Sequence, residues 1–286
     1  MRSILKCPVC QGRLTVGATA ATCELHHSFD LARSGYLNLL LPDQRRSTEP
    51  GDSPDMMRHR RAFLLAGFYN DVAQATAAAV SDALNGRAHA NIADLGCGEG
   101  FFLAHLKRAR AAHPAHHYYG IDISRSGVKM ATTYDRAITW IVAGLHSSPF
   151  EARSLDVVLS MCAPIAGEEF RRVIRDNGAL ITVTPGPDHL DALRAIIYPS
   201  VVPHSPTPAL LADDTRFTLS GSSRVRYSIA LESQAVIMDL LSMTPFYWNI
   251  SLETRARVEA CSRLGVTVDL AVNVFRPRPA ESAQSK

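Results

Sequence analysis

Apolar residues along this chain follow two recurring patterns. Short continuous runs predict buried strands, and recurrences three or four residues apart predict helices. Strands are predicted over 91–95, 117–122, 140–143, 155–160, 178–183, 224–231 and 265–275, and helices over 101–109, 124–133, 168–175, 188–197 and 236–243. The stretch 55–84 is also helical in spacing, with a break near Gly67. This order predicts an α/β fold, a doubly wound sheet of about seven strands that binds its ligand at the carboxyl ends of the early strands.

Three glycines at alternate positions follow the first of these strands. Gly96, Gly98 and Gly100 come directly after Asp94-Leu95, and a helix begins beyond them. Glycine lets the backbone turn sharply and approach a ligand, and the helix N-terminus supplies free N–H groups. Asp122 ends the next strand, 22 residues beyond Gly100. At this spacing a carboxylate meets a ribose hydroxyl in nucleoside-binding βαβ units, so the pattern predicts a nucleoside ligand.

The glycine spacing also separates two classes of nucleoside ligand. A dinucleotide fingerprint reads Gly-x-Gly-x-x-Gly, whereas here Glu99 follows the second glycine and the third glycine comes one residue early. An acid beside the turn favours a ligand with a cationic end. Asp94-x-Gly-x-Gly-x-Gly resembles the first motif of class I methyltransferases that use S-adenosylmethionine. The resemblance implies that the glycines pass under the amino acid part of the cofactor and that Asp122 holds its ribose.

The first 34 residues carry a separate candidate site. Cys7 and Cys10 form a Cys-x2-Cys pair, and Cys23 with His27 begins twelve residues later. Four such ligands suit one tetrahedral zinc ion, with His26 as the alternative to His27 or as its neighbour. Because the protein would fill all four positions, the site is expected to be structural. A unit this small buries too little apolar surface to fold alone, so we expect the metal to hold it together.

Composition limits the class of protein further. The chain has 286 residues, 47% of them hydrophobic, enough for one large α/β domain with an appendage. No apolar run reaches the roughly 18 residues of a membrane span, and the first residues lack the apolar core of a signal peptide. Three of the six cysteines are scattered, a poor disulfide pattern, which favours a cytoplasmic protein. The net charge of +3 neither demands nor excludes a nucleic-acid partner.

One known family combines these features. The motif Cys-Pro-x-Cys, then Cys-x3-His-x-Phe-Asp-x-Ala-x-x-Gly-Tyr-x-Asn-Leu-Leu, resembles the N-terminus of the 23S ribosomal RNA guanine-N1 methyltransferases, bacterial enzymes with a zinc ribbon ahead of a methyltransferase domain. The resemblance covers nearly the whole chain. It continues in order through Pro50-Gly51-Asp52-Ser53, Arg60-Arg61-Ala62-Phe63-Leu64, the glycine motif, Ala163-Pro164, Thr184-Pro185-Gly186-Pro187-x-His189-Leu190 and Met243-Thr-Pro-Phe246.

This resemblance implies a function in some detail. The cofactors would be S-adenosylmethionine and a structural Zn²⁺, and the target would be guanine N1 in the loop of hairpin 35 of 23S rRNA. Two subtypes of the family methylate neighbouring guanines. The run 50–63 and the pair Cys97 and Glu99 look more like the Gram-negative-type subgroup, which favours position 745 over position 748.

The resemblance also assigns residues and domains. The predicted cofactor-binding set is Tyr69, Asp94, Gly96, Gly98, Gly100, Phe102, Leu103, Asp122 and His189, and the predicted zinc ligands are Cys7, Cys10, Cys23 and His27. The chain is divided into a zinc-ribbon RNA-recognition domain over 1–34, a linker and helical segment that caps the cofactor site over 35–84, a methyltransferase domain over 85–276, and a disordered tail over 277–286.

The sequence does not assign the atom that is methylated or the catalytic base. The segment after strand 155–160 lacks the Asn/Asp-Pro-Pro motif of enzymes that methylate exocyclic amines. Cys162 lacks the Pro-Cys or Thr-Cys setting of a pyrimidine C5 nucleophile, so it is predicted to be a packing residue. The remaining candidate reactions are methylation of a ring nitrogen, of an oxygen or of a small molecule. The catalytic base is unknown; Glu99, Asp156 and His189 are candidates.

Partners and competing functions complete the prediction. We expect the RNA to be bound by the N-terminal zinc-binding segment and by five arginines, Arg45, Arg46, Arg58, Arg60 and Arg61. The proline-rich stretch 199–208, with His204, is expected to be a surface loop near the site. No membrane partner is expected, and a homodimer is left open. Two alternatives are a small-molecule methyltransferase, which would need no zinc ribbon, and a non-catalytic ribosome- or RNA-binding factor, which would not need an intact glycine motif.

Overall fold

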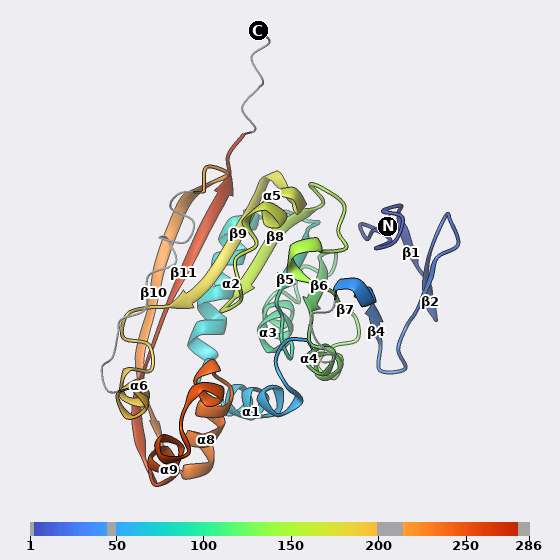
Figure 1. Ribbon diagram of the computed structural model, residues 1–286. Coiled ribbons are helices and arrows are strands. Elements are labelled where there is room, and N and C mark those ends of the chain that lie inside the picture. The colour runs from blue at the N-terminus through green and yellow to red at the C-terminus, as the bar shows by residue number, and fades with distance from the viewer. Residues whose placement is uncertain (1–2, 45–49, 199–213, 280–286) are drawn as a thin grey trace.

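The computed structural model describes residues 3–44, 50–198 and 214–279, and these form two sheets (Figure 1). The small N-terminal sheet is antiparallel and consists of β1 (Leu14–Val16), β2 (Ala20–Cys23) and β3 (Ser28–Asp30). The large sheet has the order β10-β11-β9-β8-β5-β6-β7-β4. Its strands are β4 (Tyr36–Asn38), β5 (Asn91–Leu95), β6 (His117–Asp122), β7 (Thr139–Val142), β8 (Leu155–Met161), β9 (Ile174–Pro185), β10 (Phe217–Leu231) and β11 (Leu264–Pro277).

The topology of the large sheet agrees with the predicted α/β class. The strands from β9 through β8, β5, β6 and β7 to β4 are parallel, and β11 and β10 are added as an antiparallel hairpin. The order reverses at β5, so the carboxyl ends of β5 and β6 flank the position at which open parallel sheets bind ligands. The glycine turn follows β5 directly.

Helices and the N-terminal sheet cover the two faces of the large sheet. Along β5 and β8 the side chains alternate. Ile92 and Val157 pack towards the helices α2 and α3, whereas Ala93 and Val158 share the opposite core with Leu5 of the N-terminal unit. The zinc-ribbon unit therefore covers part of the second face. The helices are α1 (Pro54–Leu65), α2 (Asn70–Leu84), α3 (Phe101–Ala109), α4 (Arg125–Ala131), α5 (Gly167–Val173), α6 (Asp191–Ile197), α8 (Gln234–Ser242) and α9 (Leu252–Glu259), with 3-10 turns η1 (Pro42–Gln44), η2 (Leu145–Ser147) and η3 (Pro245–Asn249).

The structure differs from the sequence-based expectation at several elements. The large sheet has eight strands rather than the predicted seven. The additional strand is β4, whose three residues lie in the segment predicted as a linker and pair with β7. Helix α6 begins at Asp191, three residues later than predicted, because Leu190 takes a left-handed conformation with φ of 53°. Strand β10 begins at Phe217 rather than near Arg224. Helix α9 was not predicted. Figure 1 shows α9 beside α8, which separates it from α1, at one end of the sheet.

Candidate functional site

The glycine turn after β5 can be formed only by residues without a side chain. The φ angles of Gly96, Gly98 and Gly100 are 95°, 55° and 90°, a region that L residues rarely adopt. A Cβ atom on Gly100 would lie 2.6 Å from the Cβ of Ala131. The Gly98 N–H donates to Asp122 Oδ2 at 2.8 Å. The glycine turn and the acid after β6 thus form one unit, which together with Asp94 we call the cradle.

Three acids lie at the cradle: Asp94, Asp122 and, within the glycine turn, Glu99. Asp94 is 1% exposed, and its Oδ1 has no hydrogen-bond partner among the described residues. Burial, reinforced by the charges of Asp122 and Glu99, raises the pKa of Asp94 to about 8. Burial also raises the pKa values of Asp122 and Glu99. Because buried carboxylate oxygens without partners are costly, the cradle fits a ligand that carries positive charge, as the sulfonium and ammonium groups of S-adenosylmethionine do.

The raised pKa of Asp94 makes the free energy of unfolding of the ligand-free protein depend on pH. The carboxyl titrates near 3.8 when unperturbed and at about 8 in the folded protein. Between these values the folded state binds more protons than the unfolded state, so the free energy of unfolding falls as pH rises. We expect Asp94→Asn to weaken this dependence and to be more stable than wild type near pH 8. Urea unfolding of the ligand-free proteins between pH 5 and 8 measures it.

The control for this prediction is Asp55→Asn, which removes a carboxylate whose side chain is 68% exposed. This variant should keep the pH dependence of wild type. Identical slopes for wild type and Asp94→Asn would show that Asp94 is already ionised in the folded protein.

Helix α1 lies over the cradle. Its first turn is fixed by Ser53, whose hydroxyl accepts the N–H of Met56 at 3.2 Å. One turn on, Arg60 Nη1 lies 3.3 Å, and Met57 Sδ 3.9 Å, from the position that a Cβ on Gly98 would take. Arg60 Nη2 donates to Asp52 Oδ2 at 2.6 Å and to the carbonyl of Met243 at 3.2 Å. The guanidinium of Arg60 is therefore a positive charge at the edge of the cradle.

The structure places three of the five arginines that were predicted to contact the RNA. Arg60 is turned towards Gly98, and Arg61 donates to the carbonyl of Met130 at 3.1 Å with its Cζ 4.5 Å from the ring centroid of Tyr134. Both guanidinium groups have partners within the protein but are only partly buried, so their contact with RNA phosphates stays a prediction. Arg58 is exposed and pairs with Asp55. Arg45 and Arg46, and the predicted loop 199–208 with His204, lie outside the described residues.

Tyr69 and His189 come from distant segments and form a pair. Tyr69 precedes the first turn of α2, and its hydroxyl lies 3.3 Å from His189 Nε2. His189 Nδ1 accepts the N–H of Asp269 at 3.2 Å. In a neutral imidazole the other nitrogen then carries the hydrogen, so Nε2–H donates to Tyr69. Burial raises the pKa of the Tyr69 hydroxyl well above its usual value. Two residues assigned to the cofactor by resemblance are thus neighbours.

Two residues discussed for the chemistry are placed differently from expectation. Cys162 is exposed rather than packed, and its φ of 48° is left-handed. Asp156 lies at the amino end of β8, remote from the cradle, where it accepts from Arg87 at 2.6 Å and from the N–H of Asn91 at 2.8 Å. Asp156 is therefore wrong as the candidate base.

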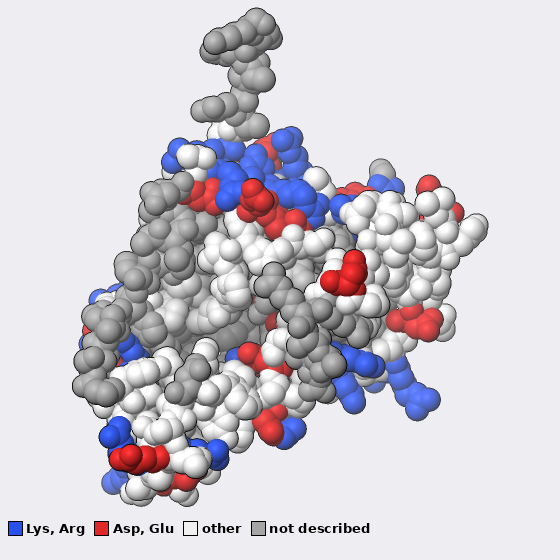
Figure 2. Space-filling model, viewed as in Figure 1, with Lys and Arg blue, Asp and Glu red and all other residues white. Residues whose placement is uncertain are grey.

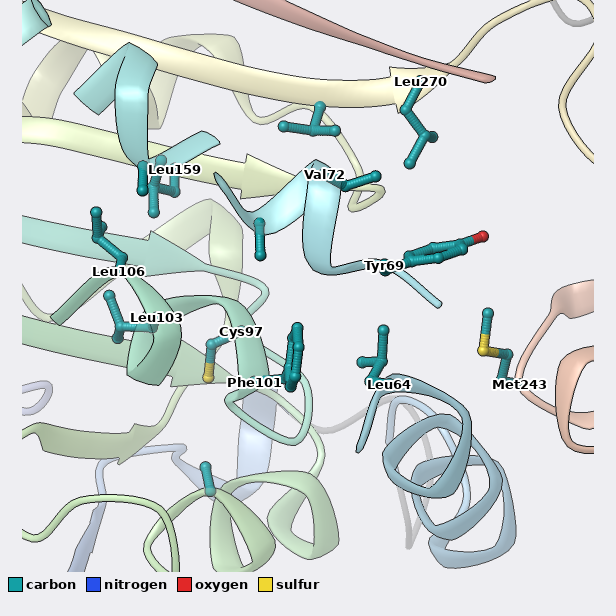
Figure 3. Close-up of a cluster of buried hydrophobic side chains, with 14 of the residues drawn as sticks. Leu64, Tyr69, Val72, Cys97, Phe101, Leu103, Leu106, Leu159, Met243 and Leu270 are labelled. Carbon is teal, nitrogen blue, oxygen red and sulfur yellow. The ribbon is translucent and has the colours of Figure 1, made fainter. Parts of the chain in front are cut away.

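Phe102 and Leu103 stand in the first turn of α3. Leu103 is fully buried, and Figure 3 shows it in the core beside Leu106. Any contact of Leu103 with a ligand at the helix N-terminus would therefore come from its backbone. Phe102 is partly buried against the same core. Their role as cofactor contacts stays a prediction.

A cavity of about 700 Å³ opens next to the cradle rather than inside it. It begins at Ile123 and Ser124, directly after Asp122, and continues below β4 to the turn between β3 and β4. Three cations, Arg33, Arg125 and Lys129, are among its lining residues. Figure 2 shows basic side chains gathered on this side, beneath the zinc-ribbon unit. Sequence reasoning missed this cavity because β4 and α4 come together only through the pairing of β4 with β7.

The four predicted zinc ligands converge in the N-terminal unit. One donor atom from each of Cys7, Cys10, Cys23 and His27 lies within 4.8 Å of the others. The Cys10 and Cys23 sulfurs are 3.6 Å apart, and His27 Nδ1 is 3.4 Å from the sulfur of Cys23. Ligands on a tetrahedral zinc lie about 3.5 to 3.8 Å from one another, so the donor set fits this ion. His26 is exposed and takes no part in the cluster.

Comparisons with known proteins identify the chain. The family model of the RlmA N-terminal zinc ribbon matches residues 5–48, and a methyltransferase domain model matches residues 92–178. The chain is therefore a methyltransferase with an N-terminal zinc ribbon. A Bacillus subtilis protein named "Putative 23S rRNA (guanine-N(1)-)-methyltransferase YxjB" is 31% identical over 94% of this chain and 96% of its own length. The chain belongs to the family of 23S rRNA (guanine-N1)-methyltransferases.

Two actinobacterial relatives have similar extents. A Micromonospora griseorubida protein named "Putative 23S rRNA (guanine-N(1)-)-methyltransferase" is 32% identical over 96% of this chain and 97% of its own length. The 23S rRNA (guanine(748)-N(1))-methyltransferase of Streptomyces fradiae is 29% identical over 96% of this chain and 97% of its own length. Among the described residues, every helix is too short or too polar to cross a membrane.

Proposed function

We propose that this enzyme transfers the methyl group of S-adenosylmethionine to N1 of a guanine in the loop of hairpin 35 of 23S rRNA. The observation that carries the proposal is the cradle, in which a glycine turn lies between the buried carboxyl group of Asp94 and the partly buried carboxyl group of Asp122, in a chain of this methyltransferase family. The proposed target is the guanine at position 745. An enzyme with this substrate would work in the cytoplasm, where ribosomes are assembled.

The preference for position 745 rests on residues around the cradle. The run 50–63 and the pair Cys97 and Glu99 resemble the Gram-negative-type subgroup, and these residues form the cover and the turn of the cradle. The Streptomyces fradiae relative is named for position 748. The two positions are therefore the two outcomes that the experiment below must separate.

The bound cofactor would supply an electrophilic methyl group. In this proposal Asp122 accepts hydrogen bonds from the ribose. Asp94 and Glu99 have raised pKa values that the cationic end of the cofactor lowers, and their ionised carboxylates then stabilise that cationic end. The guanine must leave its stack to reach the cradle. Its N1 carries a proton at neutral pH, so a nearby base must accept that proton. Of the candidates considered from the sequence, Glu99 remains, because both ring nitrogens of His189 are engaged, Nδ1 with the Asp269 N–H and Nε2 with Tyr69.

The zinc-ribbon unit has a structural part in this proposal. Cys7, Cys10, Cys23 and His27 would hold one Zn²⁺ with no open coordination position, so the ion would take no part in methyl transfer. The unit packs against the large sheet through Leu5 and through an ion pair of 2.7 Å between Arg13 and Glu151. It would thereby present a rigid surface next to the cavity below β4.

Methyl transfer to 23S rRNA that lacks its own modifications tests the proposal. With labelled S-adenosylmethionine, wild type should label the RNA and create one new primer-extension stop in the hairpin loop, because N1 methylation blocks base pairing. Asp122→Ala should lose both signals. A stop for position 748 would correct the subtype alone. Label without a stop would contradict the N1 assignment, and bound cofactor without label would favour a small-molecule enzyme or a non-catalytic factor.

A further inference from the structure

An aromatic cluster lies on the surface beside α1, outside the cradle. Tyr198 and Phe246 pack edge-to-face with centroids 5.8 Å apart, and Tyr247 and Trp248 do so at 5.2 Å. Three of these residues belong to η3. Trp248 is 59% exposed, whereas Trp140, the other tryptophan of the chain, is 1% exposed. The turn η3 thus presents the large ring of Trp248 to solvent, more exposed than Tyr198 at 37%.

The ring of Trp248 is held in place by its neighbours. Its Nε1–H points to the sulfur of Met56 at 2.8 Å, and Tyr247 packs against it at an interplanar angle of 89°. Arg255 of α9 lies over Tyr247, with its Cζ 5.0 Å from the ring centroid. An exposed ring that is fixed in this way loses little side-chain entropy when a partner stacks on it.

The cluster is close to the cradle along α1. Met56 contacts Trp248, and the next residue, Met57, packs against Gly98 of the glycine turn. The helix that supports Trp248 is therefore also the helix that covers the cradle. Arg255 lies over Tyr247 and Arg58 stands two residues after Met56, and each is paired with a carboxylate, Glu259 and Asp55 respectively.

We propose that Trp248 is a stacking platform for an unpaired base of the RNA, next to the guanine that enters the cradle. The inference rests on the proposed function. Proteins that recognise single-stranded loops stack splayed bases on aromatic side chains and place guanidinium groups near the backbone phosphates. Removing such a contact weakens RNA binding by about 1–3 kcal/mol, or roughly 5- to 150-fold.

Binding of a hairpin 35 transcript to wild type, Trp248→Ala and Trp248→Phe tests the platform. We expect RNA to quench the tryptophan fluorescence of wild type, because Trp140 is buried and Trp248 is exposed. Trp248→Ala should bind the transcript about 5- to 150-fold more weakly, whereas Trp248→Phe, which keeps a ring, should stay within about fivefold of wild type. The affinity of all three proteins for S-adenosylhomocysteine should be the same.

The matched control is Leu252→Ala, which removes an apolar side chain that is 86% exposed at the start of α9. This variant should bind the transcript like wild type. Unchanged affinity of Trp248→Ala, together with unquenched wild-type fluorescence, would overturn the platform. A change of oligomeric state in Trp248→Ala would also overturn it, because the cluster would then be a contact between copies of the chain. Failure of wild type itself to bind or methylate the transcript would instead contradict the proposed function.

Discussion

Replacing Arg60 with glutamine should weaken the binding of S-adenosylhomocysteine by about 10- to 100-fold and leave the binding of 5′-methylthioadenosine within about threefold. The two ligands share the adenosine and the sulfur, but only the first has the amino acid part with its carboxylate. The selective loss would identify Arg60 as the group that binds this carboxylate.

The expectation follows from the charges around Gly98. Arg60 Nη1 lies 3.3 Å from the position of a Cβ on Gly98, whereas its Nη2 is already bonded to Asp52 and to the Met243 carbonyl. Burial raises the pKa values of Glu99 and Asp122, and the charge of Arg60 partly offsets this rise, so Arg60 acts on the acids of the cradle. A charge-assisted hydrogen bond contributes about 1.5–3 kcal/mol, which sets the size of the expected loss.

Titration calorimetry with both ligands measures the effect. Arg58→Gln is the matched control, because Arg58 stands on the same helix with a side chain that is 62% exposed and pairs only with Asp55 among the described carboxylates. It should bind both ligands like wild type. An equal loss of both ligands in Arg60→Gln would mean that Arg60 merely holds α1 over the cradle through Asp52 and Met243. Undiminished binding of S-adenosylhomocysteine would exclude the contact altogether.

The same region shows how far the sequence can predict the site. Local patterns located the glycine turn, Asp94 and Asp122, because each pattern lies within one strand or one turn. The pairing of Tyr69 with His189 joins residues from separate elements, and no local pattern contains it. Arg60 was assigned to RNA because a cluster of arginines on a helix is typical of a phosphate-binding surface. Only the packing of α1 on Gly98 shows that this guanidinium faces the cradle.

The fold was predictable to a similar extent. Strands buried on both faces, such as β5 and β8, have continuous apolar runs and were predicted within one residue. Strand β4 has three residues, too few for a periodic signal, and its position depends on pairing with β7. Helix α9 is largely polar and buries only Val258, so its sequence lacks an apolar stripe. The missing elements are thus those that tertiary contacts stabilise.

Removal of the zinc ion should have the second large effect. We expect it to unfold the N-terminal unit and to leave the large sheet folded. We expect one Zn²⁺ per chain in the purified protein, and we expect Cys23→Ser to lose it. Structural zinc contributes on the order of 10 kcal/mol to the folding of small units, and β1 to β3 contribute few large apolar side chains to the core. The N-terminal unit should therefore unfold without the ion.

The unfolding that follows loss of the ion should not extend to β4. Leu37 of β4 and Phe150 belong to the same core as Leu5 and Leu14, but β4 is also paired with β7 in the large sheet. Limited proteolysis of Cys23→Ser should cleave within residues 3–31 and leave the remaining chain intact. Binding of S-adenosylhomocysteine should change by less than about threefold, since the cradle is formed by β5, β6 and α1, whereas binding of the hairpin transcript should be lost.

Cys261→Ser is the matched control for this experiment. Cys261 follows α9, far along the chain from the cluster, and donates only to the carbonyl of Arg257 among the described residues. The variant should keep the zinc ion, the protease resistance and the RNA affinity of wild type. A Cys23→Ser protein that retains one zinc ion would mean that Cys23 is not a ligand. Loss of cofactor binding together with the zinc ion would instead show that the N-terminal unit stabilises the cradle, because the shared core around Leu5 and Phe150 transmits its unfolding to the large sheet.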